Sequence, residues 1–125
     1  MIDETYSDLI LELNKNPINK KRIKGISYRD KNPFCGDEIE MILNIEKGKV
    51  IDAGFQGYGC AISQAAASLI SEQVKGKDIK EIVRMEIDSV LEELGVPGLK
   101  NNHVRIKCAL LPLKALKMAG FIHLA

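Results

Sequence analysis

Three cysteines and one aspartate are the side chains of this 125-residue sequence best suited to chemistry. Each stands at a predicted turn or helix start: Cys35 and Asp37 in Pro33-Phe34-Cys35-Gly36-Asp37, Cys60 directly after Gly57-Tyr58-Gly59, and Cys108 directly after Arg105-Ile106-Lys107. Helix N-termini and nearby cations stabilise a thiolate, the form of cysteine that binds metals. Three thiolates and a carboxylate would suit a tetrahedral zinc ion or one edge of an iron–sulfur cluster. The residue types therefore indicate a small metal or sulfur site.

Spacing alone does not decide between such a site and three separate buried thiols. A lone cysteine is more often a small buried hydrophobe than a ligand. Turns at the ends of a sheet, however, are poor places to bury apolar atoms, and the glycines beside Cys35 and Cys60 let the backbone approach an ion. Permanent electron-transfer clusters usually have four thiolate ligands. A carboxylate such as Asp37 would therefore favour a labile cluster, of the kind that a carrier needs.

A predicted β-hairpin separates Cys35 from Cys60 and returns its two ends to each other, so these cysteines should be neighbours. Alternating apolar residues predict its strands, and helical spacing predicts the helices. The expected strands are 22–28 (weakly), 38–46 and 49–56, with a turn at Lys47-Gly48; the expected helices are 3–14, 61–75, a short one after Asp78, 86–94 and 108–119. This order predicts an α+β fold with an antiparallel sheet covered on one face. We interpret residues 1–125 as a single domain.

Two details of this prediction concern the ends of the elements. Gly57-Tyr58-Gly59 is expected to end the second hairpin strand just before Cys60. Pro112 is expected within about the first turn of the last helix, where proline is tolerated.

Composition and charge exclude several classes of function. The 18 basic and 17 acidic residues nearly cancel, which argues against nucleic acid as a partner. No apolar stretch approaches the ~18 residues that a membrane span needs, and no signal peptide is visible. An odd number of cysteines without such a signal fits a reducing compartment, so we expect a cytoplasmic protein. The basic run 20–24 is either a solvated edge or a docking patch for an acidic protein.

Several motifs occur in order along the chain: Asn16-Pro17-x-Asn19, Pro33-x-Cys35-Gly36-Asp37, Gly57-x-Gly59-Cys60-x-Ile62-Ser63, Val74-Lys75-Gly76-Lys77, and finally Cys108. Together they resemble the IscU/NifU/SufU family of iron–sulfur cluster assembly scaffolds, over about residues 5–120. The resemblance implies a three-stranded antiparallel sheet with helices packed on one face, as in SufE/NifU-like folds. It also implies that Cys35, Asp37, Cys60 and Cys108 hold a [2Fe-2S] cluster, iron or zinc.

The chain departs from the main branches of that family in three ways. IscU proteins have a histidine ligand before the third cysteine, where this chain has Lys107. Lys107 and Arg105 resemble the SufU branch, but SufU proteins carry an insertion for which residues 61–107 leave no room. The segment 96–100 matches the chaperone-recognition motif of IscU only in part. The chain thus combines SufU-like motifs with an IscU-like length.

The resemblance implies two alternative functions. As a scaffold, the chain would accept persulfide sulfur from a cysteine desulfurase on Cys108, beside the cations of Lys107 and Arg105, and pass a cluster to apo iron–sulfur proteins. The cluster would be held by one chain or shared in a homodimer or trimer. As a zinc-dependent sulfurtransferase of SufU type, the chain would bind zinc with the same four groups and accept sulfur on a cysteine released from it. We interpret the chain as a carrier rather than an enzyme; as an enzyme it would be a sulfurtransferase.

Two further interpretations concern zinc and histidine. A purely structural zinc domain is disfavoured, because structural sites usually use closely spaced ligand pairs and the sequence contains no Cys-x-x-Cys. His103 is either a replacement fourth ligand or an exposed loop residue, and His123 is assigned no role.

Overall fold

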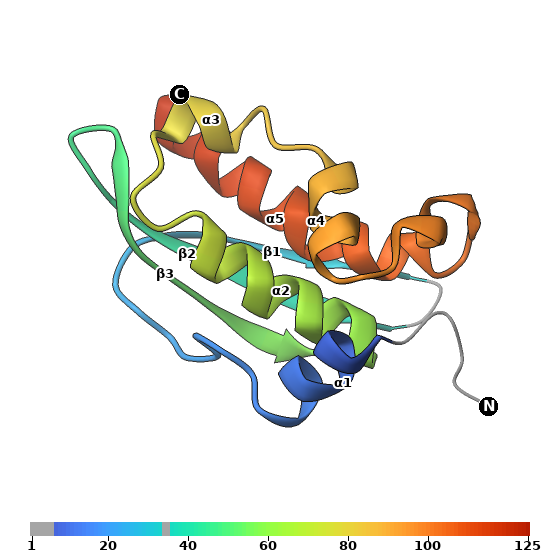
Figure 1. Cartoon of the computed structure of the whole chain (residues 1–125). Coiled ribbons are helices and arrows are strands. Elements are labelled where there is room, and N and C mark those ends of the chain that lie inside the picture. The colour runs from blue at the N-terminus through green and yellow to red at the C-terminus, as the bar shows by residue number, and fades with distance from the viewer. Residues whose placement is uncertain (1–6, 34–35) are drawn as a thin grey trace.

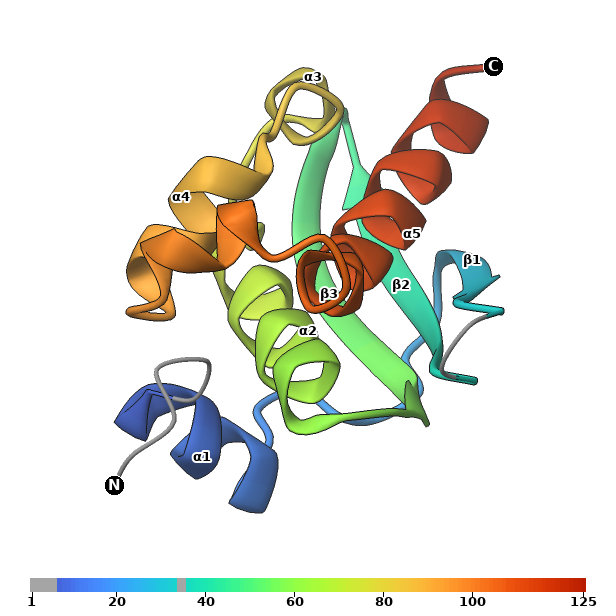
Figure 2. The same cartoon turned by 90° about the vertical axis from the view of Figure 1, so that its right-hand side faces the viewer.

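The computed structural model of the protein describes residues 7–33 and 36–125. One antiparallel sheet has the strand order β1-β2-β3, formed by β1 (Ile26–Lys31), β2 (Glu38–Glu46) and β3 (Lys49–Tyr58). The helices are α1 (Asp8–Lys15), α2 (Ala61–Gln73), α3 (Ile79–Ile82), α4 (Ile87–Glu93), the 3₁₀ helix η1 (Pro97–Asn101) and α5 (Ile106–Leu124). Helices α2 and α5 lie side by side on one face of the sheet (Figure 1), and Figure 2 shows the same layers from the side. The predicted α+β fold with a three-stranded sheet is confirmed.

Strands β2 and β3 form the predicted hairpin, joined at Lys47 and Gly48. Both turn residues have positive φ angles, 52° and 78°, as a two-residue turn of type I′ requires. Strand β1 begins at Ile26 instead of residue 22, because the chain before it crosses the face of the sheet opposite α2 and α5. A Cβ atom on Gly54 would lie only 2.6 Å from the Lys21 carbonyl oxygen, which shows how closely this crossing approaches β3.

The alternating apolar residues of β2 face the helices and form the centre of the core. Ile39, Met41 and Leu43 are fully buried there, as the pattern predicts. Ile42, which breaks the alternation, is also only 1% exposed. It pairs across the hairpin with Gly54, against which the 18–24 connection lies. The 18–24 connection therefore covers Ile42 and accounts for a burial that the alternating pattern does not predict.

Strand β3 extends two residues beyond its predicted end, because Gly57 does not break it. Gly57 pairs with Ile39 in the sheet and has a φ angle of 128°. A Cβ atom at this position would lie 2.0 Å from the Glu38 carbonyl oxygen, so only glycine permits the approach. The hairpin consequently closes at the Glu38–Tyr58 pair, and Asp37 and Cys60 lie just beyond that pair.

The first four helices match the predicted segments except at their ends. Helix α1 begins at Asp8, with the Ser7 side chain accepting a hydrogen bond from the Ile10 N–H; residues 3–6 of the predicted helix lie outside the described residues. Asp78 caps α3, as predicted, by accepting a hydrogen bond from the Lys80 N–H at 2.9 Å. These caps fix the ends of short helices whose intrinsic stability is low.

Helix α5 is longer at both ends than the predicted segment 108–119. Pro112 is therefore its seventh residue and lies beyond the first turn, which corrects the prediction. Pro112 has no N–H to donate to the carbonyl of Cys108, so packing against the core must hold the helix together there. Within the described ranges, no helix is long and apolar enough to cross a membrane.

Candidate metal centre

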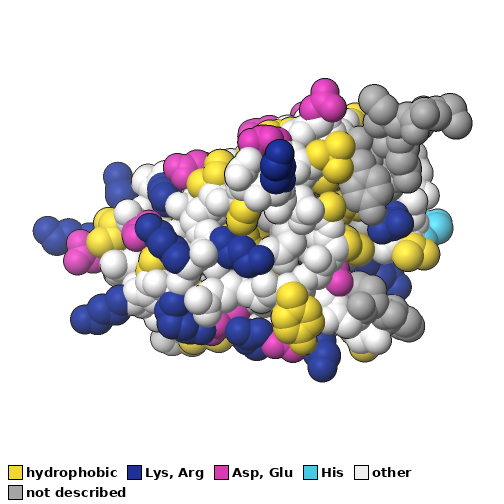
Figure 3. All heavy atoms as spheres, turned by 90° about the horizontal axis from the view of Figure 1, so that it is seen from below, with side chains coloured by type: hydrophobic (Ala, Val, Ile, Leu, Met, Phe, Trp, Pro, Cys, Tyr) yellow, Lys and Arg dark blue, Asp and Glu magenta, His cyan; other side chains and the backbone are white. Residues whose placement is uncertain are grey.

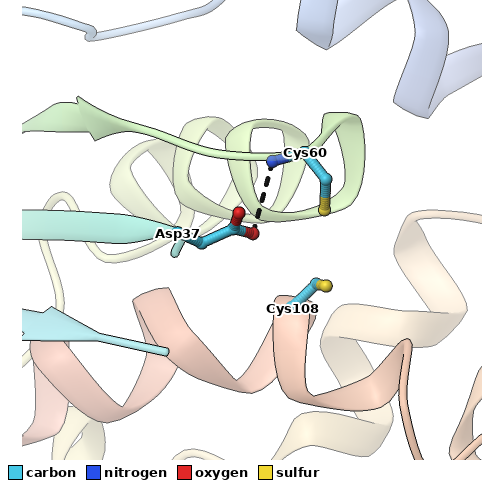
Figure 4. A group of neighbouring side chains, drawn as sticks. All are labelled: Asp37, Cys60 and Cys108. Atoms are coloured by element: carbon cyan, nitrogen blue, oxygen red, sulfur yellow. Dashed lines mark hydrogen bonds between the residues drawn. The ribbon is translucent and has the colours of Figure 1, made fainter. Parts of the chain in front are cut away.

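The fold brings three of the four predicted ligands together at one end of the sheet. Asp37 precedes β2, Cys60 is the N-cap of α2, and Cys108 lies in the first turn of α5. One carboxylate oxygen of Asp37 and the two Sγ atoms all lie within 4.8 Å of one another. Figure 4 shows the two sulfurs facing the same space, with the carboxylate beside them. Cys35, the remaining predicted ligand, lies outside the described residues.

Cys60 has the chemistry of a thiolate ligand. Its pKa is lowered to about 6, first by a hydrogen bond from the Cys108 side chain and then by the backbone N–H groups of Ser63 and Ile62. These amides belong to the first turn of α2, whose N–H groups have no carbonyl partner within the helix. Burial and the Asp37 carboxylate oppose this effect and raise the pKa. At neutral pH the site therefore presents a sulfur anion to a metal ion or a sulfur donor.

Asp37 is packed tightly against the start of α2. Its side chain is buried, and its Oδ2 atom accepts a hydrogen bond from the Cys60 N–H at 3.3 Å. Gly59 makes this approach possible, because a Cβ atom there would lie 2.9 Å from Asp37 Oδ2 and 2.4 Å from Ser63 Oγ. The Ser63 hydroxyl donates to the Cys60 carbonyl at 3.0 Å. Gly59 and Ser63 thus fix the position of the Asp37 carboxylate relative to Cys60.

The predicted cations beside Cys108 lie at the start of α5. Arg105 is the residue before the helix, and Lys107 is its second residue. The Lys107 side chain lines a surface hollow together with Asn32 and Pro33. Cys108 itself is only 4% exposed. Sulfur transfer to Cys108 would therefore require a partner that reaches into the site, or a movement of the residues that cover it.

The two histidines do not join the ligand group. His103 lies in the turn before α5 and His123 in the last turn of that helix, and both are exposed. Among the described residues, Asp37, Cys60 and Cys108 are the only group of three with ligand atoms close enough together to hold a metal ion. The position of His103 favours the interpretation as an exposed loop residue.

Sequence reasoning missed the residues that fix α2 in place. Ser68 Oγ accepts a hydrogen bond from the Ile18 N–H at 3.1 Å, and Asn19 Nδ2 donates to Ser71 Oγ at 3.1 Å. Lys75 Nζ donates to Asn19 Oδ1 at 2.9 Å. The sequence did carry a signal for this contact, because these serines and the lysine recur at helical spacing along an otherwise alanine-rich helix.

Gln64 belongs to the same polar stripe but has no such partner. Its side chain is only 5% exposed, and neither Nε2 nor Oε1 makes a hydrogen bond to the described residues. A buried amide without partners is costly and rare in native structures. Gln64 follows Cys60 by one helical turn, so the unfavourable free energy of burying this amide arises at the site end of α2.

Comparison with known proteins identifies the family. A family model described as "NifU-like N terminal domain" matches residues 5–121, and the chain belongs to this family. The resemblance noted from the motifs is thereby confirmed.

Individual relatives carry two different activities at nearly equal similarity. The chain is 36% identical to a zinc-dependent sulfurtransferase, SufU, of Bacillus subtilis, covering 93% of this chain and 89% of that one. It is 35% identical to an iron–sulfur cluster assembly scaffold protein, IscU, of Thermotoga maritima, covering 91% of each chain. A crystal structure from Fervidobacterium islandicum, of a candidate scaffold protein for the SUF system, matches with a TM-score of 0.80 and 30% identity over 93% of this chain and 96% of that one. The chain is thus similar both to an assembly scaffold and to a sulfurtransferase.

Proposed function

We propose that this protein is a scaffold for iron–sulfur cluster assembly. It accepts persulfide sulfur from a cysteine desulfurase together with ferrous iron, builds a labile [2Fe-2S] cluster with a thiol reductant supplying the remaining electrons that convert this sulfur to sulfide, and transfers the cluster to apo-proteins. The observation that carries the proposal is the meeting of Asp37, Cys60 and Cys108, from three separate elements, with ligand atoms within 4.8 Å of one another. We propose Cys35 as the fourth ligand, since its segment leads directly to Asp37.

The chemistry of the ligands supports a carrier. Thiolates bind iron strongly, whereas a carboxylate is a harder and more easily exchanged ligand for such a cluster. Asp37 therefore provides the position at which the cargo can be released. Cys108 is proposed as the persulfide acceptor; its thiol, which donates to Cys60 in the metal-free site, would have to lose its proton first, and the cations of Lys107 and Arg105 would favour that loss.

A second candidate is a zinc-dependent sulfurtransferase. It is supported by the SufU relative and by Lys107 at the position where IscU proteins have a histidine ligand. Chain length does not separate the two candidates. Both alignments, over 132 and 133 residues, exceed the 125 residues of this chain, so the SufU and the IscU relative each contain residues that it lacks.

Metal and sulfide analysis distinguishes the candidates. The protein is incubated anaerobically with a cysteine desulfurase, cysteine and ferrous iron, and iron, acid-labile sulfide and zinc are measured per chain. The scaffold proposal predicts equal iron and sulfide with visible absorption bands, and transfer of both to an apo-ferredoxin. Tightly held zinc, no cluster and an accelerated desulfurase would instead establish the sulfurtransferase.

A further inference from the structure

A hollow of about 250 Å³ lies beside the ligand cluster, between the end of β1 and the first turns of α5. The two elements that form it are neighbours in Figure 2. Its floor is apolar and is made by Pro33, Leu110 and Leu111. Leu110 is 37% exposed although it is a large hydrophobic residue on a helix. A hollow of this size accommodates one or two apolar side chains of another molecule.

The rim of the hollow is strongly basic. Lys31, Lys107 and Lys114 line it, and Asp30 is the one acidic residue among its described lining residues. Asp30 already faces Lys114, with 3.7 Å between Oδ2 and Nζ. With three lysines against one aspartate, the described lining places more positive than negative charge around an apolar floor. Such a surface is complementary to a segment in which an apolar side chain is flanked by carboxylates.

The walls of this lysine-rimmed pocket connect it to the metal centre. Lys107 directly precedes Cys108 on α5. On the other wall, Asn32 is tied to the start of the site, because its N–H donates to the Asp37 carbonyl and its carbonyl accepts from the Gly36 N–H, both at 2.8 Å. A segment seated in the pocket would thus contact both chain segments that position the ligands.

We propose that the lysine-rimmed pocket is the docking point for an acidic segment of the cysteine desulfurase, which anchors an apolar side chain against Leu110 and Leu111. This proposal rests on the proposed function and specifies how the sulfur donor is held. Docking there would place the donor next to the turn of α5 that contains Cys108. It would also explain why basic residues surround an apolar surface at this end of the molecule.

Two pocket variants and one matched control test the proposal. Leu110→Ser removes part of the apolar floor and Lys114→Glu reverses a rim charge, while both side chains are exposed enough to leave the core intact. Lys24→Glu makes the same charge reversal before the start of β1, at the opposite end of that strand. The control is needed because Figure 3 shows basic side chains spread over the face seen from below, with acidic ones between them.

The measurement is the rate of desulfurase-dependent sulfur transfer at increasing concentrations of each variant. We expect the concentration that gives half the maximal rate to rise about tenfold for Leu110→Ser and Lys114→Glu, with the maximal rate unchanged, because docking and not chemistry is weakened. Lys24→Glu should match the wild type. Loading with ferrous iron and inorganic sulfide, without desulfurase, should be the same for all four proteins.

Each contrary result has a distinct meaning. Wild-type kinetics for both pocket variants would overturn the pocket proposal while leaving the proposed function intact. An equal effect of Lys24→Glu would overturn it in favour of general electrostatic attraction. A wild-type dimer in sedimentation that Leu110→Ser dissociates would show that a second copy of the chain occupies the pocket. A wild-type protein that takes up neither sulfur nor metal would overturn the proposed function itself.

Discussion

The two ends of α2 are built in opposite ways. In its C-terminal half and just beyond it, Ser68, Ser71 and Lys75 each have a hydrogen-bond partner in the connection that follows α1. At its N-terminus, the Cys60 N–H donates to the Asp37 carboxylate of the site, and Gln64, one turn further on, has no partner within the described residues. Helix α2 is therefore anchored at its C-terminal end, away from the site. The site end can then exchange partners without loosening the fold.

The largest effect is expected at the anchored end, from Asn19→Ala. This change removes the hydrogen bonds to Ser71 and Lys75 and places alanine at a φ angle of 63°. The free energy of unfolding should fall by about 2–3 kcal/mol, measured by urea denaturation without metal. Asn16→Ala, which removes a hydrogen bond from the Asn16 side chain to the exposed Glu12, should cost less than about 0.5 kcal/mol. Equal losses for the two variants would show that α2 is not anchored by this contact.

At the site end, Gly59→Ala should weaken loading more than it weakens the fold. The new Cβ atom would press on Asp37 and Ser63, and so displace the carboxylate from Cys60. We expect metal affinity to fall by about tenfold or more, as for other changes that disturb ligand orientation, measured by competition with a chelator. Gly98→Ala is the control, because a Cβ atom there meets nothing within 4 Å. Unchanged affinity in Gly59→Ala would mean that Asp37 does not need this close packing.

The thiolate at the site end can be tested by its pH dependence. The rate of alkylation of Cys60 in the metal-free protein, followed by mass spectrometry, should reach half its maximum near pH 6. Cys108→Ala should raise that midpoint, because it removes the hydrogen bond that is the main cause of the lowered pKa of Cys60. Because the pKa is about 6 in the folded protein and 9.0 without the fold, the unfolded state binds more protons between these values. The stability contributed by Cys60 is therefore full above pH 9 and is lost as the pH falls through 6. A midpoint near pH 9 in the wild type would contradict the prediction that the folded protein lowers the pKa of Cys60.

The smallest effect is expected from Gln64→Leu, and it should have the opposite sign to Ser68→Ala. Replacing an amide that has no described partner removes a desolvation penalty, so the metal-free protein should gain about 1 kcal/mol in the free energy of unfolding. Ser68→Ala should lose about 1 kcal/mol, since the Ile18 N–H loses its acceptor. A loss for Gln64→Leu would mean that its amide is satisfied in solution. The contrast between the two ends of α2 would then be weaker than the structure indicates.

The hairpin, and with it the nearness of Asp37 to Cys60, could be predicted from the sequence because both depend on local patterns; the expected nearness of Cys35 to Cys60 stays a prediction, since Cys35 lies outside the described residues. The alternation over 38–46 and the turn at Lys47-Gly48 specify the two strands and the pairs next to the turn, whereas the register shift between Asn44 and Ile45 was not predicted. Once the hairpin closes, its two ends must meet. This is why the position of these two ligands did not require knowledge of the rest of the fold.

Features that depend on distant segments could not be predicted in the same way. The burial of Ile42 requires the crossing chain at residues 18–24, and the stripe on α2 requires Asn19, which lies far away in sequence. The start of α5, and with it the place of Pro112, is likewise set by packing rather than by local propensity. The burial of Cys108 follows from that packing, and its sequence context alone suggested an accessible thiol.

Pro112 has a consequence for the motions of the metal centre. Pro112 cannot donate a hydrogen bond to the Cys108 carbonyl, so one backbone hydrogen bond fewer joins the first turn of α5 to the rest of the helix. The rest of the helix packs on β1 and β2. Segments of this kind open locally at a lower free energy than the whole molecule unfolds. Deuterium should accordingly enter the amides of residues 106–109 faster than those of 113–120. The buried sulfur of Cys108 would then be reached during brief openings of a single turn, and the frequency of these openings would limit the rate of cargo exchange.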